Sequence, residues 1–267
     1  MKTTQRIAIA ALAGALATPL ASAHEVWLLP SSTVLSKAGY VTVDGAVSND
    51  TFHFNYRPLR IADNLVITAP DGSRVEAENL QPGELRTVFD AKLEQTGSYR
   101  LAVVNAGVMA SWKEGDESKR WRGPRAKLEA NVPADAVDLR LRESAGRVET
   151  FVTIGSPTQI EPAGAGLELV PVTHPNDLYS GETATFAFVL DGKPAADTKV
   201  TILPGGARYR DSLDKIELIT DADGRIAVTW PKPGMYYLST SVSSSDASLR
   251  NADRRSSYSA TLEVLPQ

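Results

Sequence analysis

The sequence predicts an all-β protein made of two β-sandwich domains of the immunoglobulin-like type. Short segments that alternate apolar and polar residues recur along the chain, and turn-forming Gly, Pro, Asn and Asp separate them. Residues 40–47 show the alternation clearly. A Pro-Asp-Gly-Ser sequence at 70–73 predicts a hairpin turn, because Asp-Gly tolerates the positive φ angles of tight turns. Many short strands with such punctuation are typical of antiparallel sandwiches.

A run rich in Gly, Pro and Ser at residues 155–166 divides this pattern, so we expect domains at 24–162 and 163–267. The second domain contains seven short strand-like segments without the Cys-Trp-Cys pattern of antibody domains. Residues 106–146 interrupt the first domain. We predict a partly helical insertion there, with short helices at 126–131 and 134–143, that serves as a lid or contact surface. The nearly balanced charges of residues 106–146 favour a solvated face.

Residues 1–23 have the layout of a secretory signal peptide. A short basic start with Lys2 and Arg6 precedes an apolar run at 7–16, and Ala-Ser-Ala ends the segment. The apolar run is too short to span a bilayer as a helix. Cleavage after Ala23 would release a periplasmic protein without membrane insertion, and His24 would become its first residue.

Composition argues against several classes of function. The chain has 28 basic and 32 acidic residues, a net charge of −4 and no long basic run, which argues against binding to nucleic acid or to anionic membranes. Cysteine is absent, so thiolate metal sites and cysteine nucleophiles are excluded. No nucleophile-elbow, zinc-protease or phosphate-binding motif is present. We therefore expect neither an enzyme nor an organic cofactor.

The three histidines of the chain, His24, His53 and His174, are the candidate metal ligands. An α-amine titrates at about 7.7–8.0 and an imidazole at about 6.5, so a first-residue histidine offers two nitrogen donors near neutral pH. Three converging histidines would form a nitrogen-rich site of the kind that suits copper, nickel or zinc, with Asp177 as an added oxygen donor. Each histidine also has an ordinary interpretation. His24 can be the first residue by chance, and His174 can be an exposed loop residue. Aromatic residues occupy alternate positions at 52–56, which predicts a strand whose other face carries His53, and this face can simply point to solvent.

Several segments resemble one known family. The start at residues 23–30 (Ala-His-Glu-Val-Trp-Leu-Leu-Pro), the segments at 147–153 and 166–171, and Gly-Lys-Pro at 192–194 are similar, in this order, to the domain-of-unknown-function 4198 family. That family consists of secreted bacterial proteins, several of them linked to nickel or cobalt uptake. The resemblance implies a β-sandwich and a metal-related role outside the cytoplasm. Only His24 matches a family motif, the Ala-His-Glu start.

The leading hypothesis is a periplasmic metal-binding protein that captures or hands over a transition metal, nickel or cobalt first and copper next. Its partners would be the metal ion and a membrane metal-uptake transporter. The alternative is a metal-free β-sandwich module that recognises a protein or another envelope component, because fold does not determine function. A copper enzyme that uses the terminal histidine is a third hypothesis, and no motif demands it.

Overall fold

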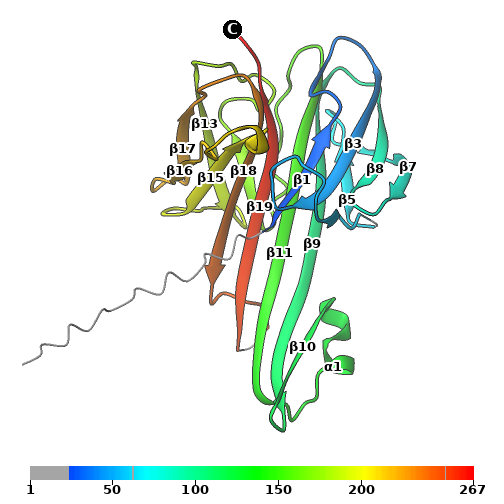
Figure 1. The fold of residues 1–267 in the computed structure, drawn as a ribbon, viewed down its shortest axis with the longest axis vertical. Coiled ribbons are helices and arrows are strands. Elements are labelled where there is room, and N and C mark those ends of the chain that lie inside the picture. The colour runs from blue at the N-terminus through cyan, green and yellow to red at the C-terminus, as the bar shows by residue number, and fades with distance from the viewer. Residues whose placement is uncertain (1–23, 62, 250) are drawn as a thin grey trace, which may run out of the picture.

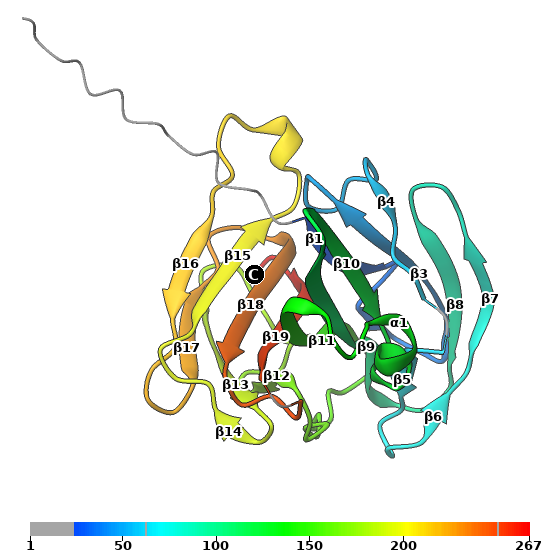
Figure 2. The ribbon, with the colours of Figure 1, turned by 90° about the horizontal axis from the view of Figure 1, so that it is seen from below.

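The computed structural model describes residues 24–61, 63–249 and 251–267, and the predicted signal peptide lies outside these ranges. It confirms the all-β prediction. Two β-sandwiches lie side by side and share one long central sheet (Figures 1 and 2). No helix in the described part of the chain is long and apolar enough to cross a bilayer.

The outer sheet of the N-terminal sandwich has the strand order β1-β3-β8-β7, with β4 paired to β3. All its pairings are antiparallel. Burial alternates along β8, as expected for a strand with one face on a core. The strands span Glu25–Pro30 (β1), Gly39–Ser48 (β3), Arg57–Pro58 (β4), Ala77–Pro82 (β7) and Thr87–Leu93 (β8).

The central sheet has the order β16-β15-β18-β19-β11-β9-β5-β6, with β10 on β9 and β2 on β11. β11 and β19 run parallel, and this pairing joins the two sandwiches. The strands span Val34–Leu35 (β2), Leu65–Thr68 (β5), Arg74–Val75 (β6), Gly97–Glu114 (β9), Glu117–Gly123 (β10), Val137–Ile154 (β11), Lys199–Pro204 (β15), Ile216–Ile219 (β16), Gly234–Ser244 (β18) and Ala252–Val264 (β19).

The outer sheet of the C-terminal sandwich has the order β12-β13-β14, with β17 paired to β13. Its strands span Leu167–Pro171 (β12), Thr183–Leu190 (β13), Lys193–Pro194 (β14) and Arg225–Thr229 (β17). Three short helical segments complete the described part of the chain: η1 (Arg125–Lys127), α1 (Leu128–Asn131) and η2 (Ala207–Tyr209). The predicted boundary at residue 163 falls in the strand-free segment between β11 and β12.

Each sandwich has its own hydrophobic core. Val41, Phe89 and Leu101 belong to the N-terminal core, whereas Phe186 and Leu238 belong to the C-terminal core. Both cores take residues from an outer sheet and from the central sheet. The predicted hairpin is confirmed, because β5 pairs with β6 across a turn in which Gly72 has a φ of +84°.

A small aromatic cluster lies at the seam between the sandwiches. Trp27 of β1 is 1% exposed and packs with Leu203 and Tyr237 of the C-terminal sandwich. Phe52 and Phe54 contact the Trp27 ring, at centroid distances of 5.5 and 5.2 Å. The indole N–H donates to Ser48 Oγ over 2.9 Å. Strand β1 is therefore attached to both halves of the molecule.

A buried charged cluster lies on three adjacent strands of the central sheet. Glu149 of β11 is fully buried and pairs with the guanidinium groups of Arg147 (2.9 Å) and Arg100 of β9 (3.5 Å). Tyr258 of β19 donates its hydroxyl to the same carboxylate over 2.8 Å. Burial, together with the neighbouring carboxylate, raises the pKa of Tyr258, so that its hydroxyl keeps its proton and remains a donor.

The insertion at 106–146 consists mainly of strand. The far ends of β9 and β11 extend beyond both sandwiches, and β10 pairs with β9 to form an arm (Figure 1). A helical segment at 125–131 agrees with the first predicted helix. The predicted helix at 134–143 is wrong, because β11 begins at Val137. Apolar and charged residues alternate from Val137 to Arg142, and this period of two suits a strand.

Candidate functional site

The loop at residues 49–56 connects β3 to β4 and lies beside the beginning of β1. We predicted a strand at 52–56, and the structure instead shows turns, with Phe52 at a φ of +60°. Phe52 and Phe54 both pack against Trp27 in the seam cluster, which holds the loop in this shape. Asn55 closes the loop, because its Oδ1 accepts from the Asn49 N–H over 3.0 Å.

His24 stands exposed immediately before β1. Its imidazole stacks on the Tyr56 ring, with 4.1 Å between ring centroids and 21° between ring planes. The loop at 49–56 therefore supplies a platform for the histidine side chain. Cleavage after Ala23 would place a free α-amine on this same residue.

Glu25 lies next to His24 and is half-buried. Its carboxylate accepts from Thr51 Oγ1 over 2.9 Å. Burial raises the pKa of Glu25 to about 7, the Thr51 hydrogen bond opposes this rise, and the nearby Asp50 carboxylate adds to it. The surroundings of His24 therefore include a carboxyl group that titrates near neutral pH.

His53 lies in the same loop and contacts Arg208 of the C-terminal sandwich. The guanidinium Nη1 is 2.8 Å from His53 Nε2 and 3.1 Å from Nδ1. Figure 2 shows the loop after β15, which carries Arg208, beside the β1 and β4 end of the N-terminal sandwich. A metal ion on His53 would have to displace this cation.

His174 lies in a different place, in the loop after β12. Its Nε2 is 2.8 Å from Ser98 Oγ, and its Nδ1 accepts from the Asn176 N–H over 3.1 Å. Ser98 also contacts Thr153, whose N–H donates to the carbonyl of Thr33 beyond the end of β1. The six residues of β1 thus separate His174 from His24 by roughly 20 Å, at about 3.3 Å per residue.

Both ring nitrogens of His174 are therefore used in structural hydrogen bonds. Asp177 is exposed and donates its backbone N–H to the His174 carbonyl over 3.0 Å. Within residues 24–61, 63–249 and 251–267, no three His, Cys, Asp or Glu side chains are grouped so that they could hold a metal ion. The structure brings the loop of His53 close to His24 and leaves His174 at the opposite end of β1.

Burial of His174 predicts a pH-dependent stability. Burial lowers the pKa of this imidazole, so the folded protein favours the neutral ring. Protonation of Glu25, whose pKa is raised in the folded protein, stabilises the fold on acidification. His174 acts in the opposite direction: below about pH 6.5 the unfolded chain binds more protons at this ring than the folded chain, so the contribution of His174 to the free energy of unfolding should fall from pH 7 to 5. In His174→Ala this fall should shrink, and stability at pH 7 should drop by about 1–3 kcal/mol, because Ser98 and Asn176 lose a partner.

Urea unfolding at both pH values checks this prediction. His24→Ala is the control, because it also removes an imidazole but at an exposed position. An unchanged pH dependence in His174→Ala would contradict the role assigned to its burial.

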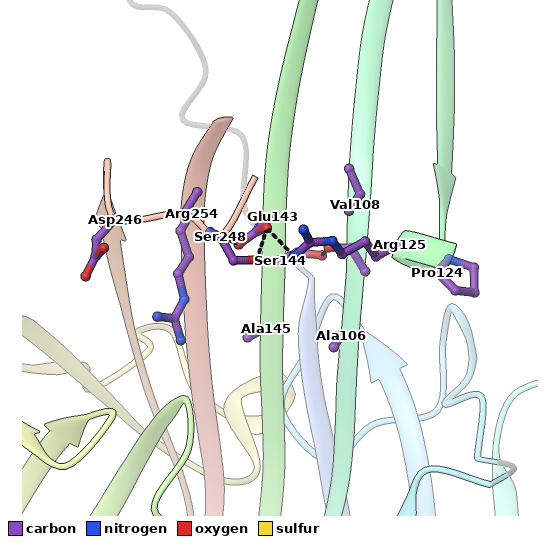
Figure 3. A pocket seen from close by; sticks show the side chains of 12 residues that line it. Ala106, Val108, Pro124, Arg125, Glu143, Ser144, Ala145, Asp246, Ser248 and Arg254 are labelled. Atoms are coloured by element: carbon purple, nitrogen blue, oxygen red, sulfur yellow. Dashed lines mark hydrogen bonds and ion pairs between the residues drawn. The ribbon is translucent and has the colours of Figure 1, made fainter. Parts of the chain in front are cut away.

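A cavity of about 670 Å³ at the base of the arm is a second feature of the structure. The sequence did not point to the individual residues that line it. Ala106, Val108 and Ala145 form its apolar wall on β9 and β11, and residues 246–248 close it from the other side (Figure 3). Glu143 accepts from Ser248 N and Oγ over 2.8 and 2.6 Å and pairs with Arg125. These charges neutralise each other. The only sequence signal for this region was the interruption at 106–146.

One family model covers most of the chain. The family described as "Domain of unknown function (DUF4198)" matches residues 21–244. The chain belongs to the DUF4198 family. This confirms the resemblance found in the sequence, and the match includes both His24 and the loop at 49–56. The search of curated proteins found no significant match.

Solved structures similar to this DUF4198 protein share little sequence with it. The D0-D1 domain of intimin is 13% identical, with 89% of this chain and 97% of that chain covered and a TM-score of 0.22. Salmonella α-2-macroglobulin reacted with methylamine is 14% identical (89% and 15% covered, TM-score 0.24). The Yersinia pseudotuberculosis adhesin InvE is 10% identical (90% and 60% covered, TM-score 0.23). The chain spans 15% of the α-2-macroglobulin and 60% of the adhesin.

Proposed function

We propose that the protein binds a transition metal in the periplasm, nickel or cobalt first and copper next, through His24 after cleavage of the signal peptide. The observation that supports this proposal is the position of His24. Its imidazole is exposed and stacked on Tyr56 at the residue where cleavage would create a new α-amine. One residue would then offer two nitrogen donors.

The donor chemistry fits these metals. The α-amine and the imidazole Nδ1 of one histidine can close a small chelate ring on a single ion. Such nitrogen donors suit nickel, copper and cobalt, and copper would bind tightest by the Irving–Williams order. Which metal is carried would therefore depend on supply and geometry. We leave His53 and His174 out of the proposed ligand set, because their side chains contact Arg208 and Ser98.

A chelate of two nitrogen donors leaves coordination positions open. Water or a group from a partner would fill them, which suits a protein that captures a metal and passes it to a membrane uptake transporter. The neighbouring Glu25 carboxyl, with its pKa near 7, would favour a bound cation more strongly as it ionises. Metal binding should accordingly weaken as the pH falls and the nitrogen donors become protonated.

Calorimetric titration with nickel and with copper tests the proposal. The protein that begins at His24 is compared with a version that carries one extra alanine ahead of His24. The added residue moves the α-amine away from the imidazole, and we expect the dissociation constant to rise at least about tenfold, the equivalent of 1.4 kcal/mol. His24→Ala should lose binding to the same extent.

His53→Gln is the matched control. Because Arg208 already lies against both ring nitrogens of His53, this variant should bind within about threefold of the parent, a difference below 1 kcal/mol. Equal binding by the parent and the alanine-extended version, or no binding by either, would overturn the metal proposal.

A metal-free binding module is the second candidate function. The cavity of about 670 Å³ at the base of the arm favours it, because apolar residues and the charged side chains of Arg125, Glu143 and Arg254 line a concave surface that needs no metal. This candidate predicts that the proteins with and without the extra alanine behave alike towards metals. A protein or another envelope component would then be the ligand.

A further inference from the structure

The arm carries an ordered array of arginine side chains on one of its faces. In the arm, β9 lies between β10 and β11 and pairs with both in antiparallel fashion. Met109 of β9 has Arg122 and Arg142 as its cross-strand partners. Two residues further along, Ser111 has Arg120 and Arg140. Because cross-strand partners point to the same side of a sheet, all four arginines share one face, which we call the arginine face.

The arginine face is the solvent side of the arm. All four arginines are exposed, and Met109 between them is 42% exposed. The opposite face carries Val108 and Ala110 of β9, which are 1% and 3% exposed. Strand alternation therefore places Val108 and Ala110 of β9 on the face opposite the arginines of β10 and β11.

Charge pairing differs between the arginine face and the rest of the arm. Lys119 pairs with Glu114 and Glu117, and Lys113 pairs with Asp138. By contrast, Arg120, Arg122, Arg140 and Arg142 form no side-chain ion pair or hydrogen bond with any described residue. Strand β19 adds one charge of each sign beside them, Asp253 in register with Arg142 and Arg255 in register with Ser144. The array therefore keeps a net charge of four positive units.

We propose that the arginine face docks on a membrane surface that carries anionic phospholipids. Adjacent strands lie about 4.8 Å apart and alternate residues about 7 Å apart, so the four Cα atoms span about 10 Å by 7 Å. Guanidinium groups bind phosphate oxygens in a bidentate manner, and lipid phosphates present themselves in a plane that such an array can face. Met109 lies between Arg122 and Arg142, where it can contact the interface.

The overall charge of the protein makes this docking directional. The chain carries a net charge of −4, so an anionic surface would repel the remainder of the molecule and attract the arginine face. The arm projects beyond both sandwiches (Figure 1), so the arginine face lies away from the rest of the molecule. This inference is independent of the metal proposal, because His24 lies outside the arm.

Sedimentation with lipid vesicles tests the proposal. The purified protein is mixed with phosphatidylcholine vesicles that either contain or lack phosphatidylglycerol. We expect binding to the anionic vesicles at low salt, and loss of binding at about 1 M salt, where the Debye length is about 3 Å. A variant with all four arginines replaced should bind at least about tenfold more weakly, since each basic residue near an anionic surface contributes measurably. Its substitutions are R120Q, R122Q, R140Q and R142Q.

A matched control removes the same charge elsewhere. It replaces four exposed cations outside the arm, K37Q, K193Q, R225Q and K232Q, and should bind anionic vesicles as well as the parent or slightly less. The double variant R122Q/R142Q gives a second measurement with fewer changes, and circular dichroism verifies that each variant is folded. Equal loss in the control and in the arginine variant would overturn the proposal, as would the absence of binding to anionic vesicles. Soluble poly-glutamate is a further probe. If it binds as tightly as the anionic vesicles, an acidic protein is the partner and the membrane proposal is overturned.

Discussion

Replacing Glu149 by glutamine should lower the free energy of unfolding by about 3–5 kcal/mol. The carboxylate is fully buried and is the common partner of Arg147, Arg100 and the Tyr258 hydroxyl. A neutral amide would leave the buried Arg147 guanidinium without its countercharge and would leave Arg100 with only a more distant carboxylate. The second carboxylate near Arg100, that of Glu168, is 3.9 Å away and is already occupied by the N–H groups of Ala163 and Gly164.

Urea unfolding of Glu149→Gln measures this loss. Glu217→Gln is the matched control, because Glu217 also pairs with two cations, Lys199 and Lys215, but at the surface. Exposed ion pairs contribute about 0–1 kcal/mol, so the control should remain close to the parent. If the two variants lose the same small amount of stability, the buried cluster does not hold the central sheet as we infer.

Replacing Trp27 by alanine should cost about 3–5 kcal/mol. The side chain is 1% exposed, and it fills the seam between the sandwiches against Leu203 and Tyr237. Its loss would open a cavity in the seam, where the aromatic cluster joins β1 to both halves. Phe52 and Phe54 would lose their main contact, so the loop that carries His53 and Tyr56 should also become more mobile.

Thermal unfolding together with limited proteolysis of the loop at 49–56 checks this prediction. Tyr209→Ala is the control, since the Tyr209 ring is 83% exposed and its removal should change stability by no more than about 0.5 kcal/mol. A Trp27→Ala protein that resists unfolding and proteolysis as well as this control would show that the seam does not hold the loop.

Local patterns were enough to predict β3 and the β5–β6 hairpin. Alternation at 40–47, the turn at 70–73 and the strand-free segment at 155–166 depend on neighbours in the chain, and the structure has β3, the β5–β6 hairpin and a connection there. Two local predictions were wrong for physical reasons. The position of Pro133 suggested that a helix begins just after it, at 134–143. The residues from Val137 onward instead alternate between apolar and charged and pair with β9 as a strand. Aromatic residues at 52, 54 and 56 suggested a strand, but packing against Trp27 bends this segment into turns.

The charges of residues 106–146 illustrate the limit of composition. They are nearly balanced along the chain, which favoured a solvated face. In the structure Lys119 has acidic partners, whereas Arg120 and Arg122 align with Arg140 and Arg142 from a distant strand. Because successive residues of a strand point to opposite faces of the sheet, charges that are neighbours in the sequence lie on different faces. The register of β10, β9 and β11 then determines which arginines lie next to one another.

The sequence by itself determined the fold class, the family and the place of His24 at the predicted cleavage site, because each depends on short-range pattern. Only the tertiary structure decided what surrounds each histidine. His24 stacks on Tyr56, His53 contacts Arg208, and His174 bonds to Ser98 beyond the other end of β1. These contacts join residues that are between 32 and 155 positions apart. Such contacts form only when the sheets assemble, because the pairing of distant strands is set by packing and register rather than by the residues next to each histidine.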